Sequence, residues 1–250
     1  MKHIFARDFR TEILELDVVF KNSLLPWWED LSGYIKQLED DVTWNMLPLV
    51  VLGIYRFNGL DRQISIAMAN IFKTLYLANS IHALVKDDKE GQEHNQKLQF
   101  SILLGDYIFG RMLKLLVQAK ADHLVGIFAH MMAEINEGMV LQHKYQIEQL
   151  EAVKRTRGPL YMRAFETAAQ LTGIDEQKQE RYRQMGLALG MSIELLAFDN
   201  LHQEMHNYMH ATEQIFKEIK QQNNTSNSTL EKVITKLHGL LCNIDGFAVV

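Results

Sequence analysis

The chain has 250 residues, 47% of them hydrophobic, which is enough to bury one large core or at most two small ones. Its formal net charge is −5, from 26 basic and 31 acidic residues with no long basic run, and this gives no support to nucleic-acid binding. The single cysteine, Cys242, excludes an internal disulfide and is typical of a reducing compartment.

The N-terminal segment interleaves charged and apolar residues, which is not the pattern of a signal peptide. The longest largely apolar runs, residues 46–55 and 102–109, are too short to span a bilayer. We therefore expect a cytoplasmic protein with no transmembrane segment.

Apolar residues recur at helical spacing along nearly the whole chain, and no stretch alternates with a period of two for long enough to predict a strand. Only three prolines are present, which favours long uninterrupted helices. The sequence predicts an all-α fold, with one domain over residues 1–250 and roughly nine to eleven helices. The clearest expected helices are 4–25, a short one from 26, 49–55 after a start at Pro48, 61–85 capped by Asp61, 102–117, 124–142, 160–171, 182–193 and a last one from 230.

Three segments are expected to interrupt these helices. Residues 89–95 form a predicted loop, and the basic segment 154–159 is expected to break the helical pattern. Residues 221–229 are the only low-complexity segment and predict an exposed loop before the last helix.

The stretch 81–114 combines an acidic pair with an apolar helix. Asp87 and Asp88 close the long helix that begins at Asp61, and residues 102–117 are apolar on nearly every side. A helix that is apolar all round is expected inside a multi-helix core. An acidic pair at the rim of such a core can hold a divalent cation through hard oxygen ligands, and a solvated helix end is the alternative interpretation.

Two parts of this stretch, ALVKDD at 83–88 and LLGDYIF at 103–109, resemble the first aspartate-rich region of trans-polyprenyl diphosphate synthases. The resemblance covers residues 61–200. It implies the single-domain isoprenoid-synthase helical bundle, in which magnesium ions lie between two aspartate-rich helix ends and face the diphosphate of an allylic substrate.

Much of the family's ligand-binding chemistry is absent from this chain. In the first motif Asp87 and Asp88 remain, with Glu90 beside them as a further candidate metal ligand, but the third aspartate position is Gly91. In the second motif the three aspartate positions fall on non-ligating residues, and Asp199 lies nearby but out of register. Those three positions are Ala197, Phe198 and Leu201.

The other binding elements are also degraded. Of the Gly-Lys-x-x-Arg-Pro element, at 43–48, only Pro48 remains. Of the Gly-Glu-x-x-Gln element, at 138–142, the glutamate position is Met139 and Gln142 is kept as a candidate substrate-binding residue. The family's Lys-Thr lies near 154–157.

Packing signatures such as Gly105-Asp106-Tyr107 remain where the ligand-binding ones are lost. Together with residues 133–137 they most resemble the small subunit (component I) of heptaprenyl diphosphate synthases. The resemblance implies a non-catalytic subunit of a heteromeric, long-chain polyprenyl diphosphate synthase that supports menaquinone side-chain synthesis. Its partner would be a catalytic large subunit, which would itself bind the Mg²⁺ of the complex.

Two alternatives stay open. The chain is a self-sufficient, Mg²⁺-dependent prenyltransferase or terpene-synthase-like enzyme that uses Asp87, Asp88, Glu90 and Asp199, or a degenerate homologue with a purely structural role. A separate feature is the set His202, His206 and His210, which shares one helix face and could bind a transition metal. Exposed or partner-facing histidines are the commoner reason for such a pattern.

Overall fold

The computed structural model describes residues 9–84, 96–223 and 229–247. Within these residues all regular structure is helical and there is no strand, which confirms the predicted all-α fold. Eleven α-helices fall in the described part of the chain, joined by three short 3₁₀ helices. The α-helices are α2 (Arg10–Ser23), α3 (Trp28–Gln37), α4 (Val42–Phe57), α5 (Arg62–Ala83), α6 (Gln96–Gln118), α7 (Val125–Tyr145), α8 (Gln149–Thr156), α9 (Gly158–Leu171), α10 (Glu176–Glu194), α11 (His202–Asn223) and α12 (Thr229–Phe247), and the 3₁₀ helices are η1 (Asp122–Leu124), η2 (Leu195–Ala197) and η3 (Asp199–Leu201).

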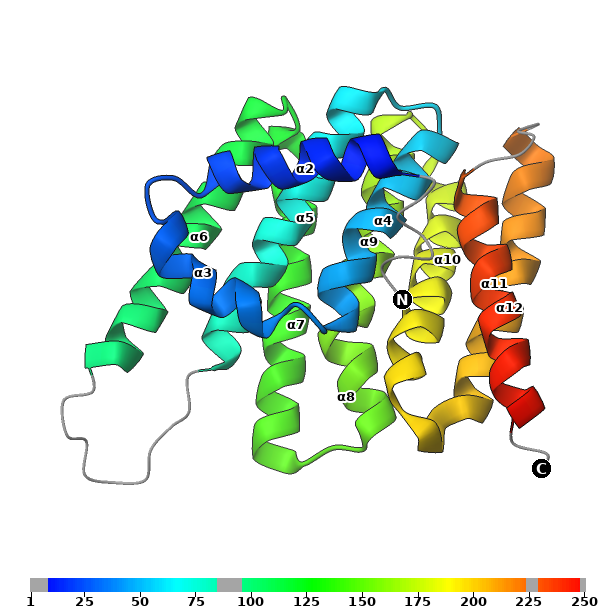
Figure 1. The fold of residues 1–250 in the computed structure, drawn as a ribbon. Helices are drawn as coiled ribbons and strands as arrows, with labels where there is room; N and C mark the ends of the chain where they lie inside the picture. Colours follow the sequence, from blue (N-terminus) through cyan, green and yellow to red (C-terminus); the bar gives the residue numbers. More distant parts are fainter. Residues whose placement is uncertain (1–8, 85–95, 224–228, 248–250) are drawn as a thin grey trace.

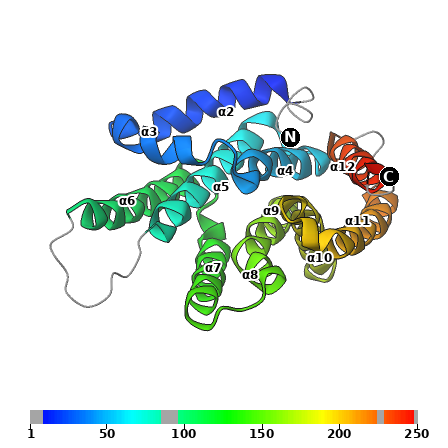
Figure 2. The same ribbon diagram turned by 60° about the horizontal axis from the view of Figure 1, so that its bottom comes forward.

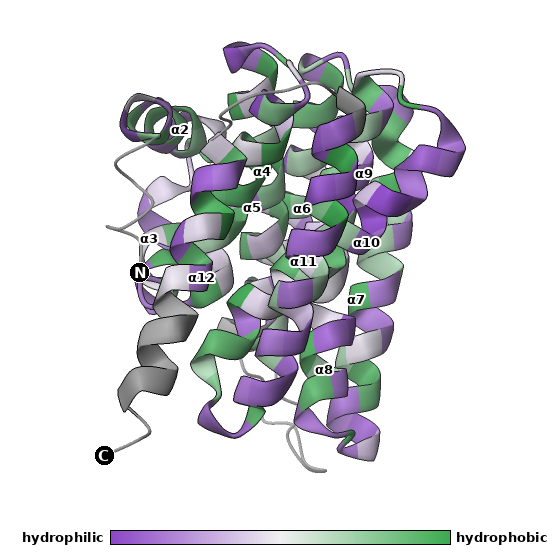
Figure 3. Cartoon of the chain, turned by 90° about the vertical axis from the view of Figure 1, so that its right-hand side faces the viewer, coloured by the Kyte–Doolittle hydropathy of each residue, from purple (hydrophilic) through white to green (hydrophobic). Residues whose placement is uncertain are grey.

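The helices form three layers (Figures 1 and 2). Helices α2 and α3 lie over a row made of α6, α5 and α4, and helices α7 to α11 lie beneath that row (Figure 2). Helix α12 returns to pack against α4. Hydrophilic and apolar turns alternate along α11, an outer helix, in Figure 3.

The middle row forms the centre of the core because α4 and α5 are apolar around most of their circumference. Asp41 caps α4 by accepting a hydrogen bond from the backbone N–H of Trp44 at 2.7 Å. Asp61 caps α5 in the same way, as the sequence predicts, with Ile64 as the donor at 2.9 Å. Each large apolar side chain that is fully buried contributes about 1.5–3 kcal/mol, so these two helices supply much of the stabilisation.

Specific side chains join the layers. Lys73 of α5 forms an ion pair with Asp17 of α2 at 3.1 Å and lies over the rings of Phe20 and Trp44. Between the middle and lower layers, the rings of Phe72 and Phe128 pack with their centroids 5.0 Å apart, and the Tyr55 hydroxyl donates to Thr167 Oγ1 at 2.8 Å.

The structure corrects two of the expected helix boundaries. Pro48 does not start a helix, because α4 begins at Val42 and Pro48 lies inside it. The basic segment 154–159 separates two helices as expected, but the break is narrower than the segment: its first half ends α8 at Thr156, and Pro159 lies in the first turn of α9.

The expected loop 221–229 is also shorter than predicted. Helix α11 continues to Asn223 and α12 begins at Thr229, and the intervening residues lie outside the described part of the chain.

The expectation that residues 102–117 are buried on every side is wrong for this chain. Helix α6 packs one face against α5, and its opposite face is exposed, with Leu103 at 67% and Val117 at 61% of full exposure. The large hydrophobic side chains exposed on α6 and on α7, two helices of different layers, are here referred to together as the α6–α7 apolar face. They are Phe100, Ile102, Leu103, Leu113, Val117, Val125, Val140 and Tyr145.

One helical segment, Asp122–Tyr145, is long and apolar enough to cross a membrane by length and composition, and only 28% of its most apolar window is buried. The expectation of no transmembrane segment was based on uninterrupted apolar runs. The polar residues His130 and Glu134 interrupt the apolar sequence of this helix, so it does not form such a run. One side of α7, with Phe128, Met131 and Ile135, is buried against neighbouring helices. Apolar residues on other sides of the helix, such as Val140, are exposed.

Candidate functional site

A pocket of about 580 Å³ opens between the middle and lower layers, at the N-terminal end of α4. Its wall is formed by the start of α4, the ends of α7 and α10, and the inward face of α8. The lining residues are Asp40, Asp41, Val42, Gln142, Ile147, Gln149, Ala152, Val153, Thr156, Arg157, Glu194, Ala197 and Phe198.

The carboxylate of Asp41 is held in place by its role at the start of α4. Its Oδ1 accepts from the backbone N–H of Trp44 at 2.7 Å and from the Tyr76 hydroxyl at 2.9 Å. The same carboxylate therefore caps one helix and contacts a side chain from α5, the next helix in the row.

Glu194, the last residue of α10, is a second fixed acid in the pocket wall. Its Oε1 accepts from the Tyr161 hydroxyl at 2.5 Å and from Thr43 Oγ1 at 2.8 Å, and the side chain is only 6% exposed. Burial raises the pKa of the Glu194 carboxyl above its ordinary value, and the two hydrogen bonds and the charge of Arg157 offset only part of that effect.

Arg157 supplies the pocket's basic group. Its guanidinium lies over the ring of Tyr76, 4.9 Å from the ring centroid. Burial alone would lower the pKa of Arg157, but its electrostatic interactions with Tyr76, Glu194 and Asp41 outweigh burial and raise it, so the guanidinium stays charged.

The raised pKa of Glu194 gives a testable dependence of stability on pH. Because the folded state favours the protonated acid, its contribution is fully present below the ordinary value of 4.5 and is lost as the pH rises through the folded-state pKa. We expect Glu194→Gln to gain stability relative to wild type as the pH rises above 4.5 and through the folded-state pKa of Glu194. Urea denaturation of both proteins across that range measures this difference.

Glu180 provides a control of opposite sign. A hydrogen bond from Arg183 lowers the pKa of Glu180, so Glu180→Gln should lose stability relative to wild type as the pH rises from acid values. Parallel pH curves for wild type and Glu194→Gln would contradict a raised pKa of Glu194 in the folded chain.

The described residues do not fit a magnesium site at the end of α10. Ala197 and Phe198 line the pocket where the second aspartate motif would place carboxylates. The Asp199 side chain is fully exposed, and its Oδ1 lies 3.9 Å from Nε2 of His202. Among the residues that the structure describes, no group of three or more His, Cys, Asp and Glu side chains is placed to hold a metal ion, and this includes His202, His206 and His210.

Of the other predicted site residues, some lie in or near the pocket and some lie outside the described residues. Gln142 lies at the pocket rim with its side chain exposed. Asp87, Asp88 and Glu90 lie outside the described residues, so their proposed metal-binding role remains a prediction. In the segment 43–48, Thr43 contributes to the site through its hydroxyl.

Sequence reasoning missed most of the polar groups that build the pocket. Tyr76, Tyr161 and Arg157 were not predicted as site residues, and Asp41 was not recognised as the cap of α4. The one usable signal was an acidic residue, Glu194, at the end of a largely apolar stretch of α10.

Comparison with known proteins shows which solved structures share this architecture. No protein-family model matches the chain, and no curated protein matches it. Among solved structures, the geranyl diphosphate synthase small subunit from Antirrhinum majus matches with a TM-score of 0.67 and 15% identity, over 95% of this chain and 99% of that one. A geranyltranstransferase from Methanosarcina mazei matches with a TM-score of 0.69 and 14% identity, over 90% and 94%.

A decaprenyl diphosphate synthase from Rhodobacter capsulatus matches with a TM-score of 0.63 and 18% identity, over 77% of this chain, which spans 63% of that synthase. At these identities the likeness shows the fold. The chain is a single helical domain with the isoprenoid synthase fold, and its structural neighbours are trans-prenyl diphosphate synthases and their small subunits.

Proposed function

We propose that this chain is a non-catalytic subunit of a heteromeric polyprenyl diphosphate synthase. The observation that carries the proposal is the pocket wall at the end of α10, where Ala197 and Phe198 stand in place of metal-binding carboxylates. A synthase of this kind must stabilise a departing diphosphate, and the described wall provides a single guanidinium for that purpose.

The expected loss of rate is large. Removing one preorganised electrostatic contact costs roughly 2.7–4 kcal/mol of activation free energy. Three independent losses sum to roughly 8–12 kcal/mol, on the order of a millionfold or more in rate. The first motif, the second motif and the diphosphate-binding element at 43–48 are each degraded in the sequence, so the chain needs an intact partner.

The α6–α7 apolar face supports the existence of that partner. Exposed apolar residues on α6 are spaced so that Leu103, Leu113 and Val117 lie on one side of the helix. An apolar surface of this kind on a folded chain is typical of a large, obligate interface. The neighbour from Antirrhinum majus is itself a small subunit, which favours a catalytic large subunit as the occupant.

Most of the finer parts of the proposal rest on the resemblance in residues 103–141. They are a heterodimer, a long-chain product of the heptaprenyl type, a role in menaquinone side-chain synthesis and Mg²⁺ bound by the partner subunit. The proposed cytoplasmic location rests instead on the single cysteine and on the pattern of the N-terminal segment. The small subunit found as a structural neighbour belongs to a geranyl diphosphate synthase, so product length has to be measured directly.

Reconstitution tests the proposal. The chain alone, an intact two-motif synthase from the same cell alone, and their mixture are each supplied with farnesyl diphosphate and radiolabelled isopentenyl diphosphate. We expect no prenyl transfer from this chain, little from the partner, and long-chain product from the mixture. Thin-layer analysis of the product gives its length, and gel filtration of the mixture measures association.

Two results would contradict the proposal. Robust prenyl transfer by this chain alone would instead support a self-sufficient Mg²⁺-dependent enzyme that uses Asp87, Asp88 and Glu90. Failure to associate with any intact synthase of the same cell would favour a purely structural role.

A further inference from the structure

The pocket at the N-terminal end of α4 is lined by both acidic and basic side chains. Asp41 lies at the start of α4, Glu194 ends α10 and accepts from Thr43 near the same start, and Arg157 follows α8 in the same lining. Among the described lining residues Arg157 is the only basic side chain, and Asp40, Asp41 and Glu194 are the acidic ones.

Tyr76 connects the cation to one of the acids. The Arg157 guanidinium lies over the Tyr76 ring, 4.9 Å from its centroid, and the hydroxyl of the same ring donates to Asp41 at 2.9 Å. Within the described part of the chain, the Arg157 side chain makes no hydrogen bond or ion pair. A largely buried guanidinium in that position is tolerable only where negative charge and an aromatic face surround it.

One carboxylate oxygen of each acid is already engaged by protein donors. Glu194 Oε1 already accepts from both Tyr161 and Thr43, and Asp41 Oδ1 already accepts from Trp44 and Tyr76. A magnesium ion requires several oxygen ligands in near-octahedral geometry, and it would also have to lie close to the positive charge of Arg157.

We propose that Arg157, in place of a divalent cation, is the counter-charge to Asp41 and Glu194, so that this pocket does not recruit a magnesium–diphosphate. The inference rests on the proposed function in one respect, because a pocket with no metal is compatible with a complex only if the partner performs the chemistry. A diphosphate entering without a metal would meet three carboxyl groups and one guanidinium, so the pocket discriminates against the substrate class of its structural neighbours.

The first test is a double-mutant cycle measured by urea denaturation of the full chain. Arg157→Met removes the charge and keeps much of the volume, and Asp41→Asn removes the opposing charge while keeping a side chain that caps α4. We expect the two substitutions to couple by about tenfold in the unfolding equilibrium constant, as groups in one network do. A cycle of Arg157→Met with Glu194→Gln should couple in the same direction.

Two further variants keep this test interpretable. Arg155→Met removes a neighbouring, exposed guanidinium that pairs with Glu151, and it should show no coupling to Asp41→Asn. Arg157→Lys keeps the charge and should lose less stability than Arg157→Met. If Arg157 and both acids show no coupling, the proposal is wrong.

The second test is calorimetric titration of the chain with MgCl₂, with inorganic pyrophosphate, and with both. We expect no magnesium-dependent pyrophosphate binding that Asp41→Asn or Glu194→Gln abolishes. Binding that either substitution abolishes would show that these acids are metal ligands and would overturn the inference. Binding that only Asp87→Ala with Asp88→Ala abolishes leaves the inference supported and counts against the non-catalytic function, so the two failures are distinguishable.

Discussion

Replacing Leu103 and Val117 together with aspartate should separate this chain from the catalytic partner proposed for it while leaving it folded. Both side chains are more than half exposed in the single chain, so the substitutions remove no core contact. In a complex that covers the α6–α7 apolar face, each unpaired buried carboxylate costs several kcal/mol. The Kd of the complex should therefore rise by at least about a hundredfold.

Gel filtration and long-chain prenyl transfer by the mixture are the measurements, with circular dichroism to confirm that the variant is folded. Leu14→Asp is the matched control, because Leu14 is equally apolar and 60% exposed but lies on α2. It should leave both association and activity unchanged. If the double variant still binds the partner as wild type does, the partner occupies a different surface.

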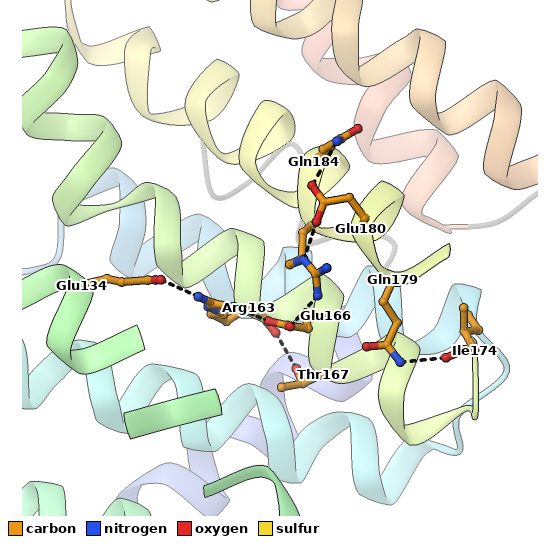
Figure 4. A network of polar contacts seen from close by, with 9 residues as sticks. Glu134, Arg163, Glu166, Thr167, Ile174, Gln179, Glu180 and Gln184 are labelled. Atoms are coloured by element: carbon orange, nitrogen blue, oxygen red, sulfur yellow. Dashed lines mark hydrogen bonds and ion pairs between the residues drawn. The ribbon is translucent and has the colours of Figure 1, made fainter. Parts of the chain in front are cut away.

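The second large effect is expected at Glu166, the centre of a polar network that joins α7, α9 and α10 (Figure 4). Its two carboxylate oxygens accept from Arg163 at 2.6 Å and from Arg183 at 2.8 Å, and the residue is only 7% exposed. Arg163 also pairs with Glu134 on α7. Glu166→Ala leaves two guanidinium groups close together without their shared acid, which should cost about 3–5 kcal/mol of unfolding free energy.

Urea denaturation at neutral pH measures this loss. Glu180→Ala is the control, because Glu180 also pairs with Arg183, at 2.8 Å, but its side chain is half exposed. An exposed pair of this kind contributes about 0–1 kcal/mol. Equal losses for the two variants would mean that the network contributes no more than an ordinary surface ion pair.

Local patterns in the sequence predicted the long helices and the cap of α5. Asp61 caps α5 as expected, because a short acidic side chain before an apolar periodic run can accept from the first free backbone N–H groups. The rule that proline starts helices failed at Pro48, because the Asp41 cap and the apolar residues after it continue the helix through the proline. Burial of the apolar helix α4 outweighs the local preference of proline for the start of a helix.

The pocket could not be predicted in the same way, because its contacts join distant parts of the chain. Thr43 and Glu194 are 151 residues apart and share one hydrogen bond. Arg157 belongs to a basic segment that was expected to interrupt the helices, and only the packing of α8 against its neighbours brings it over Tyr76. The sequence identified degraded motifs, whereas the groups that replaced them became visible only in three dimensions.

The α6–α7 apolar face also affects how this chain can be produced. A chain synthesised without its partner presents Leu103, Val117 and Val140 to other chains, which promotes aggregation and recognition by chaperones and proteases. Free partner at a hundred times its Kd would stabilise the folded chain by about 2.7 kcal/mol. If the proposed function is correct, soluble yield should increase with co-expression of the partner, and the cellular abundance of this chain should follow that of the proposed partner synthase.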